Sequence, residues 1–212
     1  MASSSPSGDR AALWTGDRPL VLASTSVTRR DLLLCAGVPV ETEAAGIDER
    51  AIEETAESRA PADLAVQLAE AKAQAVCRRR PQRLVLGADQ VLELDREVLH
   101  KPADRAAALS HLTRLSGRRH LLHSAWALAR DGRILDRFVD SASLTMRSLS
   151  TAEIARYLDA AGEAALSGAG SYQVEGLGIH LFESIAGDHS TILGLPLIPL
   201  LARLRGLGCL GI

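Results

Sequence analysis

The chain has 212 residues, of which 47% are hydrophobic, 24% are charged and only 3% are aromatic, and its formal net charge is -2. The scarcity of aromatic side chains argues against base-stacking surfaces, and the near-neutral charge argues against broad attraction to nucleic-acid polymers or acidic membranes. Three distant cysteines without a CxxC pair predict neither a zinc site nor a disulfide framework. We therefore expect a cytoplasmic protein with an aliphatic core.

The start of the chain, MASSSPSGDR, lacks the apolar stretch of a secretory signal, so we expect residues 1–17 to form a flexible tail. No linker follows, and residues 18–212 are expected to fold as a single domain. The first predicted elements are a strand in residues 19–24 and a helix in residues 30–37. We expect Thr28 to cap this helix, with Asp31 reaching back to it.

The middle of the chain continues with a helix in residues 60–80, whose apolar side chains recur at helical spacing. A buried strand in residues 83–95 is expected to break at Gly87. A helix in residues 105–118 and two long strands around the Asp131-Gly132 turn come next.

Ser150 and Glu153 form a capping box that opens a helix in residues 151–162. A glycine-rich segment occupies residues 167–178, before a strand in residues 179–187 and a final helix in residues 195–208. Strands and helices alternate without a repeat, which predicts an α/β fold with a mixed sheet.

Two arginines, Arg29 and Arg30, stand at the start of the first helix, where each cation costs about 0.3–1 kcal/mol against the helix dipole. A strand–turn–helix entry attracts anions, and Ser24 adds a hydroxyl to it. A phosphate held between the arginines would reverse the penalty. The alternative is that both arginines point to water or pair with Asp31.

Two carboxylates are candidates for a metal site. Asp89 is expected at the end of a buried strand and Glu49 on a loop, and two hard oxygen ligands plus substrate phosphates are a usual way to hold Mg²⁺. Each could instead be an ordinary turn or surface carboxylate. Lys72 within a helix and Lys101 before a proline could bind phosphate or simply be solvated.

Seven motifs in the same order resemble the Maf family of nucleoside triphosphate pyrophosphatases over roughly residues 20 to 207. They are LASTSVTRRDLL, GIDE, QLAEAKA, LGADQVLELDREVLHKPAD, LSGR, GAGSYQVEGLG and LFESIAGDHSTILGLPL. The resemblance implies an enzyme that cuts a nucleoside triphosphate between its α- and β-phosphates with Mg²⁺, Mn²⁺ or Co²⁺. It also implies a central mixed β-sheet flanked by helices, a deep cleft and, often, a homodimer.

The resemblance also implies residue roles. Asp89 would be the general base and a metal ligand together with Glu49, and Lys101 would stabilise the leaving pyrophosphate. The phosphate-binding residues would be Ser24, Arg29, Arg30 and Lys72. The family's S-P-R-R loop reads Ser26-Val27-Thr28-Arg29-Arg30 here, a departure that affects the reach of the arginines.

Thr28, Gln90 and Glu175 are the candidates for base specificity. Gln90 and Glu175 are similar to the 7-methyl-GTP branch of the family, whereas Ala88 keeps the GAD motif of the dTTP/UTP branch. A carboxylate such as Glu175 can accept from both N1–H and the 2-amino group of guanine. That branch, however, carries an aromatic residue at the place of Thr28.

The alternatives are a dTTP/UTP pyrophosphatase, an enzyme for damaged nucleotides without strict base choice, and a nucleotide-binding cell-division regulator with little turnover. The altered loop before Arg29 motivates the last of these, because it could weaken catalysis and leave binding intact.

Overall fold

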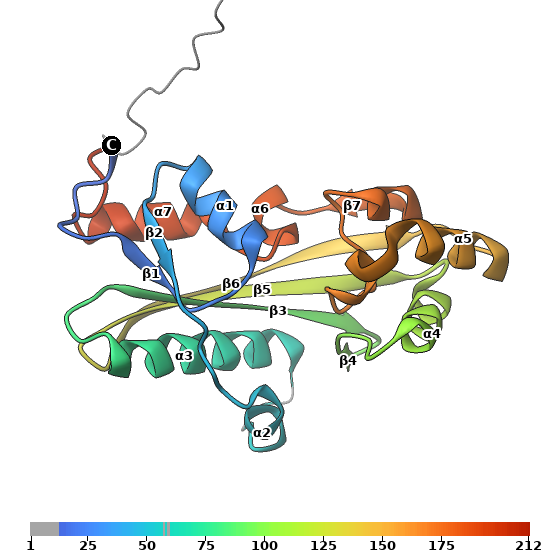
Figure 1. Cartoon of the computed structure of the whole chain (residues 1–212), viewed down its shortest axis with the longest axis horizontal. Coiled ribbons are helices and arrows are strands. Elements are labelled where there is room, and N and C mark those ends of the chain that lie inside the picture. Colours follow the sequence, from blue (N-terminus) through green and yellow to red (C-terminus); the bar gives the residue numbers. More distant parts are fainter. Residues whose placement is uncertain (1–12, 57, 59) are drawn as a thin grey trace, which may run out of the picture.

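The structure, a computed structural model, describes residues 13–56, 58 and 60–212, and its strands form one mixed sheet (Figure 1). The strands are β1 (Leu20–Leu22), β2 (Val40–Thr42), β3 (Val85–Leu94), β4 (Glu97–Leu99), β5 (Arg119–Arg130), β6 (Arg133–Met146) and β7 (Phe182–Ala186). They lie in the order β2-β1-β3-β5-β6-β7, with β4 paired to β3. β1 is parallel to β2 and β3, and the other pairs are antiparallel, so the expected mixed α/β sheet is confirmed.

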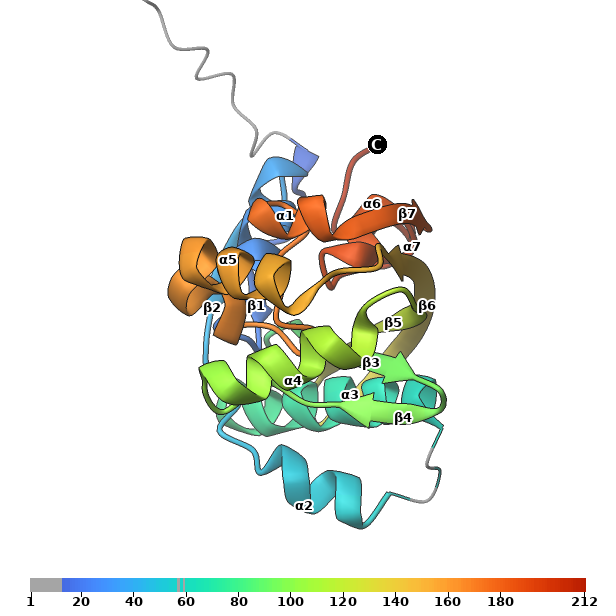
Figure 2. The same cartoon turned by 90° about the vertical axis from the view of Figure 1, so that its right-hand side faces the viewer.

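Helices cover both faces of this sheet. They are α1 (Val27–Cys35), α2 (Glu49–Glu54), α3 (Pro61–Arg79), α4 (Arg105–Leu115), α5 (Thr151–Ala161), α6 (His189–Ile192) and α7 (Leu197–Gly206). In Figure 1, α3 runs along one face and α1 and α7 lie on the other, while α4 and α5 lie at the far end of the long strands. Figure 2 shows α2 below α3, apart from the sheet.

The core is divided among three apolar clusters. Two of them lie on opposite faces of the sheet, because successive side chains of a strand point to opposite faces. Val85 and Val91 of β3 pack with the alanine-rich face of α3. Leu86 of β3 packs on the opposite face with α1 and α7. The third cluster joins the far ends of β3, β5 and β6 to α4 and α5, and it forms a second lobe.

The strand β3 is continuous through Gly87, so the break expected there is wrong. A side chain at Gly87 would overlap the carbonyl oxygen of Ala69, and its Cβ would lie 2.5 Å from the backbone nitrogen of Ala73. Glycine is therefore needed because α3 crosses close to the strand, and not because the chain turns.

Two further expectations need correction. Residues 13–17 were assigned to the tail, but Trp14 pairs with Leu210 and the backbone N–H of Thr15 donates to Cys209 at 3.0 Å; residues 1–12 lie outside the described residues. The strand expected in residues 179–187 is shorter, because a 3₁₀ turn (Leu177–Leu181) precedes β7.

Two local expectations are confirmed. The capping box of Ser150 and Glu153 opens α5, and β5 and β6 form the expected hairpin. The three cysteines are free. In the part of the chain that the structure describes, no helix combines the length and apolar character needed to span a bilayer.

Candidate active site

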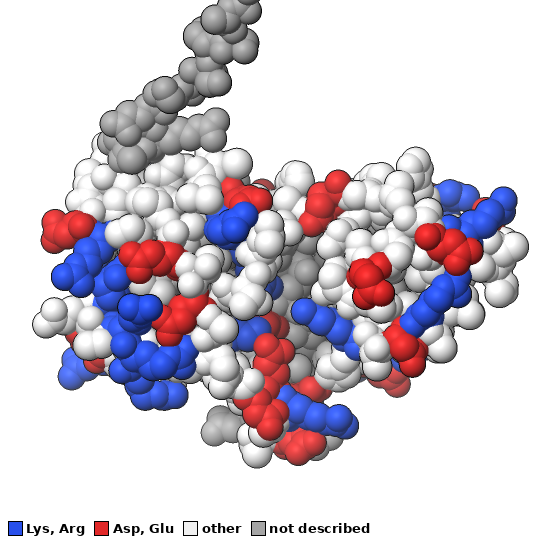
Figure 3. Space-filling model, viewed as in Figure 1, with Lys and Arg blue, Asp and Glu red and all other residues white. Residues whose placement is uncertain are grey.

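A cavity of about 1060 Å³ opens between the two lobes. Figure 3 shows the hollow with acidic and basic side chains along it. Its walls come from the turn between β1 and α1, from α2, α3 and β3, from the segment after β4 and from the glycine-rich segment. The predicted site residues that line it are Ser24, Thr28, Arg29, Glu49, Lys72, Asp89, Gln90, Lys101 and Glu175. Arg30 is the predicted site residue that this lining does not include.

The first helix begins at Val27, three residues earlier than predicted. Ser26, not Thr28, is the N-cap, and its hydroxyl accepts from the backbone N–H of Arg29 at 3.3 Å. The hydroxyl of Ser24 accepts from the N–H of Ser26 at 3.1 Å. These two side-chain bonds fix a turn of backbone N–H groups at the positive end of a helix dipole, beside the cavity.

The two arginines go to different places, since neighbouring residues on a helix point about 100° apart. Arg29 enters the cavity, and its guanidinium donates to the carbonyl oxygens of Gly194 at 2.9 Å and Ala88 at 3.1 Å. Burial lowers the pKa of Arg29, with Asp89 and Glu49 opposing that shift, but an arginine stays charged. Arg30 pairs with Asp31 at 2.9 Å on the surface. The alternative that both arginines pair with Asp31 or point to water is therefore right for Arg30 and wrong for Arg29.

An ammonium joins the two predicted metal ligands. Nζ of Lys72 lies 2.7 Å from Oε1 of Glu49 and also pairs with Oδ1 of Asp89. Asp89 lies in the middle of β3 rather than at a strand end, and Glu49 begins α2 instead of lying on a loop; Asp48 caps that helix. Both expected positions were wrong, yet the two carboxylates meet because β3 and α2 flank the same helix, α3.

Burial dominates the charge state of Asp89. Its pKa is raised because desolvation disfavours the carboxylate, and the nearby charges of Lys72 and Arg29 only partly offset this effect. A carboxyl group with a raised pKa, poised beside a polar cavity, is suited to accept a proton from water.

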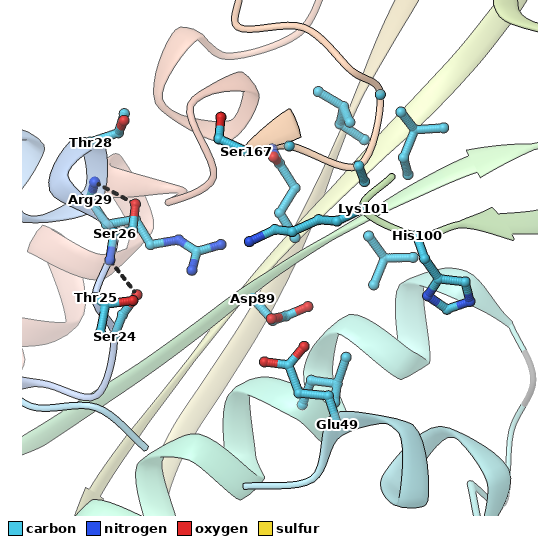
Figure 4. A pocket seen from close by; sticks show the side chains of 18 of the residues that line it. Ser24, Thr25, Ser26, Thr28, Arg29, Glu49, Asp89, His100, Lys101 and Ser167 are labelled. Atoms are coloured by element: carbon cyan, nitrogen blue, oxygen red, sulfur yellow. Dashed lines mark hydrogen bonds between the residues drawn. The ribbon is translucent and has the colours of Figure 1, made fainter. Parts of the chain in front are cut away.

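Cations also stand on opposite walls of the cavity. In Figure 4, Arg29 and Lys101 point toward one another from the two lobes, and Asp89 and Glu49 lie side by side beneath them. A polyanion in the gap would contact positive charge from both lobes and would have two carboxylates beside it. That arrangement fits a polyphosphate with a bridging cation.

Within residues 13–56, 58 and 60–212, no three His, Cys, Asp or Glu side chains gather as a closed metal site. Glu49 and Asp89 therefore offer two carboxylates, which is the donor set expected for a hard cation that takes its other ligands from phosphate and water. The residues present fit Mg²⁺ or a similar ion in that way.

At the rim of the cavity, Thr28 donates from its hydroxyl to Oε1 of Glu175 at 3.2 Å. This bond connects α1 to the glycine-rich segment across the opening. Gln90 is oriented differently, because its amide nitrogen donates to the carbonyl of Ile192 at 2.9 Å and to the hydroxyl of Ser124 at 3.0 Å. Its carbonyl oxygen is thus the group left for a substrate.

Tyr172 anchors the glycine-rich segment. Its hydroxyl bonds to Nε2 of His120 at 2.7 Å, and both rings are buried. Burial raises the pKa of Tyr172 and lowers the pKa of His120 to about 4, so the pair is neutral at pH 7. Tyr172 therefore gives little of its ring to a bound base.

Several lining groups were not predicted. Arg50, Glu53 and His100 stand in the lining, with Nε2 of His100 lying 3.5 Å from Oε1 of Glu53. Arg50 and His100 are sequence neighbours of the predicted site residues Glu49 and Lys101, and this proximity was the one sign in the sequence that they could line the cavity. No sequence pattern predicts that the carbonyl oxygens of Gly194 and Ala88 accept hydrogen bonds from Arg29.

Comparison of the sequence with known proteins finds similar proteins over nearly the whole chain. Residues 19–207 match the family model described as Maf-like protein. The "Nucleoside triphosphate pyrophosphatase" of Rhodopseudomonas palustris (strain BisB18) is 55% identical over 193 residues, which cover 91% of this chain and 96% of that protein. The protein of the same name from Nitrobacter winogradskyi is 55% identical over 194 residues, covering 92% and 96%. The "7-methyl-GTP pyrophosphatase" of Mesorhizobium japonicum is 52% identical over 193 residues, covering 90% and 97%.

Proposed function

Because the chain belongs to the Maf-like protein family, we propose that it is a nucleoside triphosphate pyrophosphatase. It hydrolyses the bond between the α- and β-phosphates and releases a nucleoside monophosphate and pyrophosphate. The observation that carries this proposal is the cavity in which Arg29 and Lys101 face one another above Glu49 and Asp89.

The triphosphate binds at the start of α1. Arg29 presents a guanidinium already oriented by two backbone carbonyls, so little side-chain freedom is lost when it binds phosphate oxygens. The turn capped by the hydroxyls of Ser24 and Ser26 lies at the positive end of the α1 dipole, which favours a phosphate at the same place. Lys101 approaches from the opposite lobe, where it neutralises charge that develops on the departing pyrophosphate.

Asp89 acts as the general base. A water molecule attacks the α-phosphorus, its proton passes to the carboxylate of Asp89, and the bond from the α-phosphorus to the bridging oxygen breaks as pyrophosphate leaves. The raised pKa makes the carboxylate a stronger base than a solvated aspartate, which favours transfer of the proton from water.

Glu49 and Asp89 would hold a divalent cation, Mg²⁺, Mn²⁺ or Co²⁺, which when bound supplies Lewis-acid activation and charge neutralisation at the phosphates. Their two carboxylates suit an ion that completes its shell with phosphate and water. We place the reaction in the cytoplasm, in keeping with the free cysteines.

The preferred substrate in this proposal is 7-methyl-GTP or a related modified nucleotide. Glu175 at the rim is acceptor-only when ionised and matches the adjacent N1–H and 2-amino donors of guanine. The relative from Mesorhizobium japonicum, whose name gives this activity, supports the same choice.

A pyrimidine triphosphate is the second candidate. Thr28 and the buried Tyr172 give the described rim no broad aromatic face for a methylated, cationic purine. The GAD form of the motif around Asp89 also resembles the dTTP/UTP branch.

A substrate panel tests both candidates. Purified protein is incubated with 7-methyl-GTP, GTP, UTP or dTTP and with each of the three cations, and pyrophosphate release is measured. We expect the largest kcat/KM with 7-methyl-GTP. Faster turnover of UTP and dTTP would transfer the assignment to the pyrimidine branch, whereas tight binding without pyrophosphate release would favour a regulator.

A further inference from the structure

The ammonium group of Lys72 occupies the space between the two candidate metal ligands. It pairs with Glu49 at 2.7 Å and with Asp89, while the side chains of Lys72 and Asp89 are only 12% and 10% exposed. Among the described residues, Lys72 is the side chain that forms an ion pair with Glu49 and with Asp89. A cation is therefore already present where a metal ion would bind.

The local charges balance without any added ion. Lys72 and Arg29 contribute two positive charges, and Glu49 and Asp89 contribute two negative ones, all within mutual electrostatic reach. The buried charges of Lys72 and Asp89 are stabilised by this pairing, whereas the Glu49 side chain is 56% exposed. A divalent cation bound to the same oxygens would lie against the ammonium and be repelled by it.

The side chain of Lys72 is flexible enough to move away from the two carboxylates. Its backbone is fixed in the interior of α3, but four flexible methylene groups connect it to an ammonium that donates in any direction. A triphosphate bound by Arg29 would offer new acceptor oxygens across the same cavity.

We propose that Lys72 is a resident counter-ion for the metal site. It holds Glu49 and Asp89 together in the free enzyme, and the divalent cation that arrives with the triphosphate displaces it from them toward the phosphates. This inference rests on the proposed function. Its consequence is coupling: the free enzyme binds the cation weakly, and cation and nucleotide each strengthen the binding of the other.

Calorimetric titration of the nucleotide-free protein with Mn²⁺ tests the inference. The variant K72M removes the competing charge, so its Kd for Mn²⁺ should fall by roughly tenfold or more relative to the wild type. K72Q, which keeps a polar side chain, should behave in the same way and serves if K72M does not fold. K72R keeps the charge and should keep the weak affinity.

The matched control is K101M, which removes a positive charge from the same cavity but from the opposite lobe. Its Kd for Mn²⁺ should change by less than about threefold, because the ion pairs of Glu49 and Asp89 among the described residues are with Lys72 and not with Lys101. An equal gain in K101M and K72M would replace the proposal with a general effect of net charge. An unchanged or weaker affinity in both K72M and K72Q would overturn it.

A second titration includes a non-hydrolysable α,β-methylene triphosphate. The wild type should bind Mn²⁺ more tightly with this analogue present, and most of that gain should be lost in K72M, whose site is already free. Pyrophosphate release by the wild type is measured separately. Release combined with unchanged Mn²⁺ binding in the variants defeats this inference alone, whereas no release from any triphosphate defeats the proposed function.

Discussion

The floor and the rim of the cavity are built differently. The floor, which we define as Arg29, Lys72 and Asp89, lies on α1, α3 and β3, and each side chain has close partners. The rim, which we define as Thr28 and Glu175, lies nearer to solvent, and one 3.2 Å hydrogen bond joins these two side chains. The difference indicates that phosphate chemistry depends on rigid elements, while base choice depends on side chains that can change at little cost to the fold.

The largest effect is expected at the floor. Asp89→Asn keeps the shape of the side chain but cannot accept the proton, so kcat should fall by about 10²–10⁴-fold, the range for loss of a general base. Pyrophosphate release under saturating nucleotide measures it. Asp48→Asn is the matched control, because Asp48 caps α2 near Glu49 and asparagine caps equally well. Undiminished turnover in Asp89→Asn would remove Asp89 from the role of general base.

The neighbouring arginines provide a sharper test. Arg29→Lys loses the planar fork that contacts two backbone carbonyls and presents donors to phosphate, so kcat/KM should fall by roughly 10–100-fold. Arg30→Lys, one residue along, should stay within about twofold of the wild type because that side chain pairs with Asp31 at the surface. Similar losses in both variants would mean that the second arginine reaches the substrate after all.

The rim should respond in selectivity more than in rate. Glu175→Gln exchanges an acceptor-only group for an amide, so the ratio of kcat/KM for 7-methyl-GTP over UTP should fall by about tenfold. Both nucleotides are assayed in competition. Glu183→Gln, at an exposed position of β7, is the control and should leave the ratio unchanged. A proportional loss with both nucleotides would place Glu175 in phosphate binding or loop stability instead of base recognition.

The smallest effect is on stability, and it depends on pH. Burial raises the pKa of Asp89 above its ordinary value of 3.8, so the folded protein holds that proton more tightly than the unfolded chain. The ionised carboxylate therefore costs stability as the pH rises through the folded pKa, and below 3.8 the cost is absent. We expect cation-free Asp89→Asn to melt above the wild type at pH 7, by roughly 2–4 °C per kcal/mol recovered, and level with it at pH 3. A lower Tm at pH 7 would show that pairing with Lys72 outweighs burial.

Much of the fold was predictable because its signals are local. The apolar spacing of residues 60–80 predicted α3, the Asp131-Gly132 turn predicted the hairpin, and Ser150 with Glu153 predicted the start of α5. The order of the motifs also led to the residues that line the cavity. These features depend on the chain near each residue, and tertiary packing leaves them intact.

The errors arose where distant segments decide. Whether the N-cap was Ser26 or Thr28 could not be resolved from a run of hydroxyl residues, each of which is a good cap. That choice sets where the helix begins relative to the two arginines. Nor does the sequence contain a sign that the carbonyl of Gly194, 165 residues away, receives Arg29.

Gly87 has a consequence beyond the packing of one strand. It lies two residues before Asp89, and the helix residue pressed against it, Ala73, directly follows Lys72. The distance between ammonium and carboxylate is thus governed by a bare α-carbon that touches neither group. One added methyl at this point would lift the helix away and uncouple the ion pair, so any redesign of this enzyme for a new nucleotide has to treat position 87 as fixed.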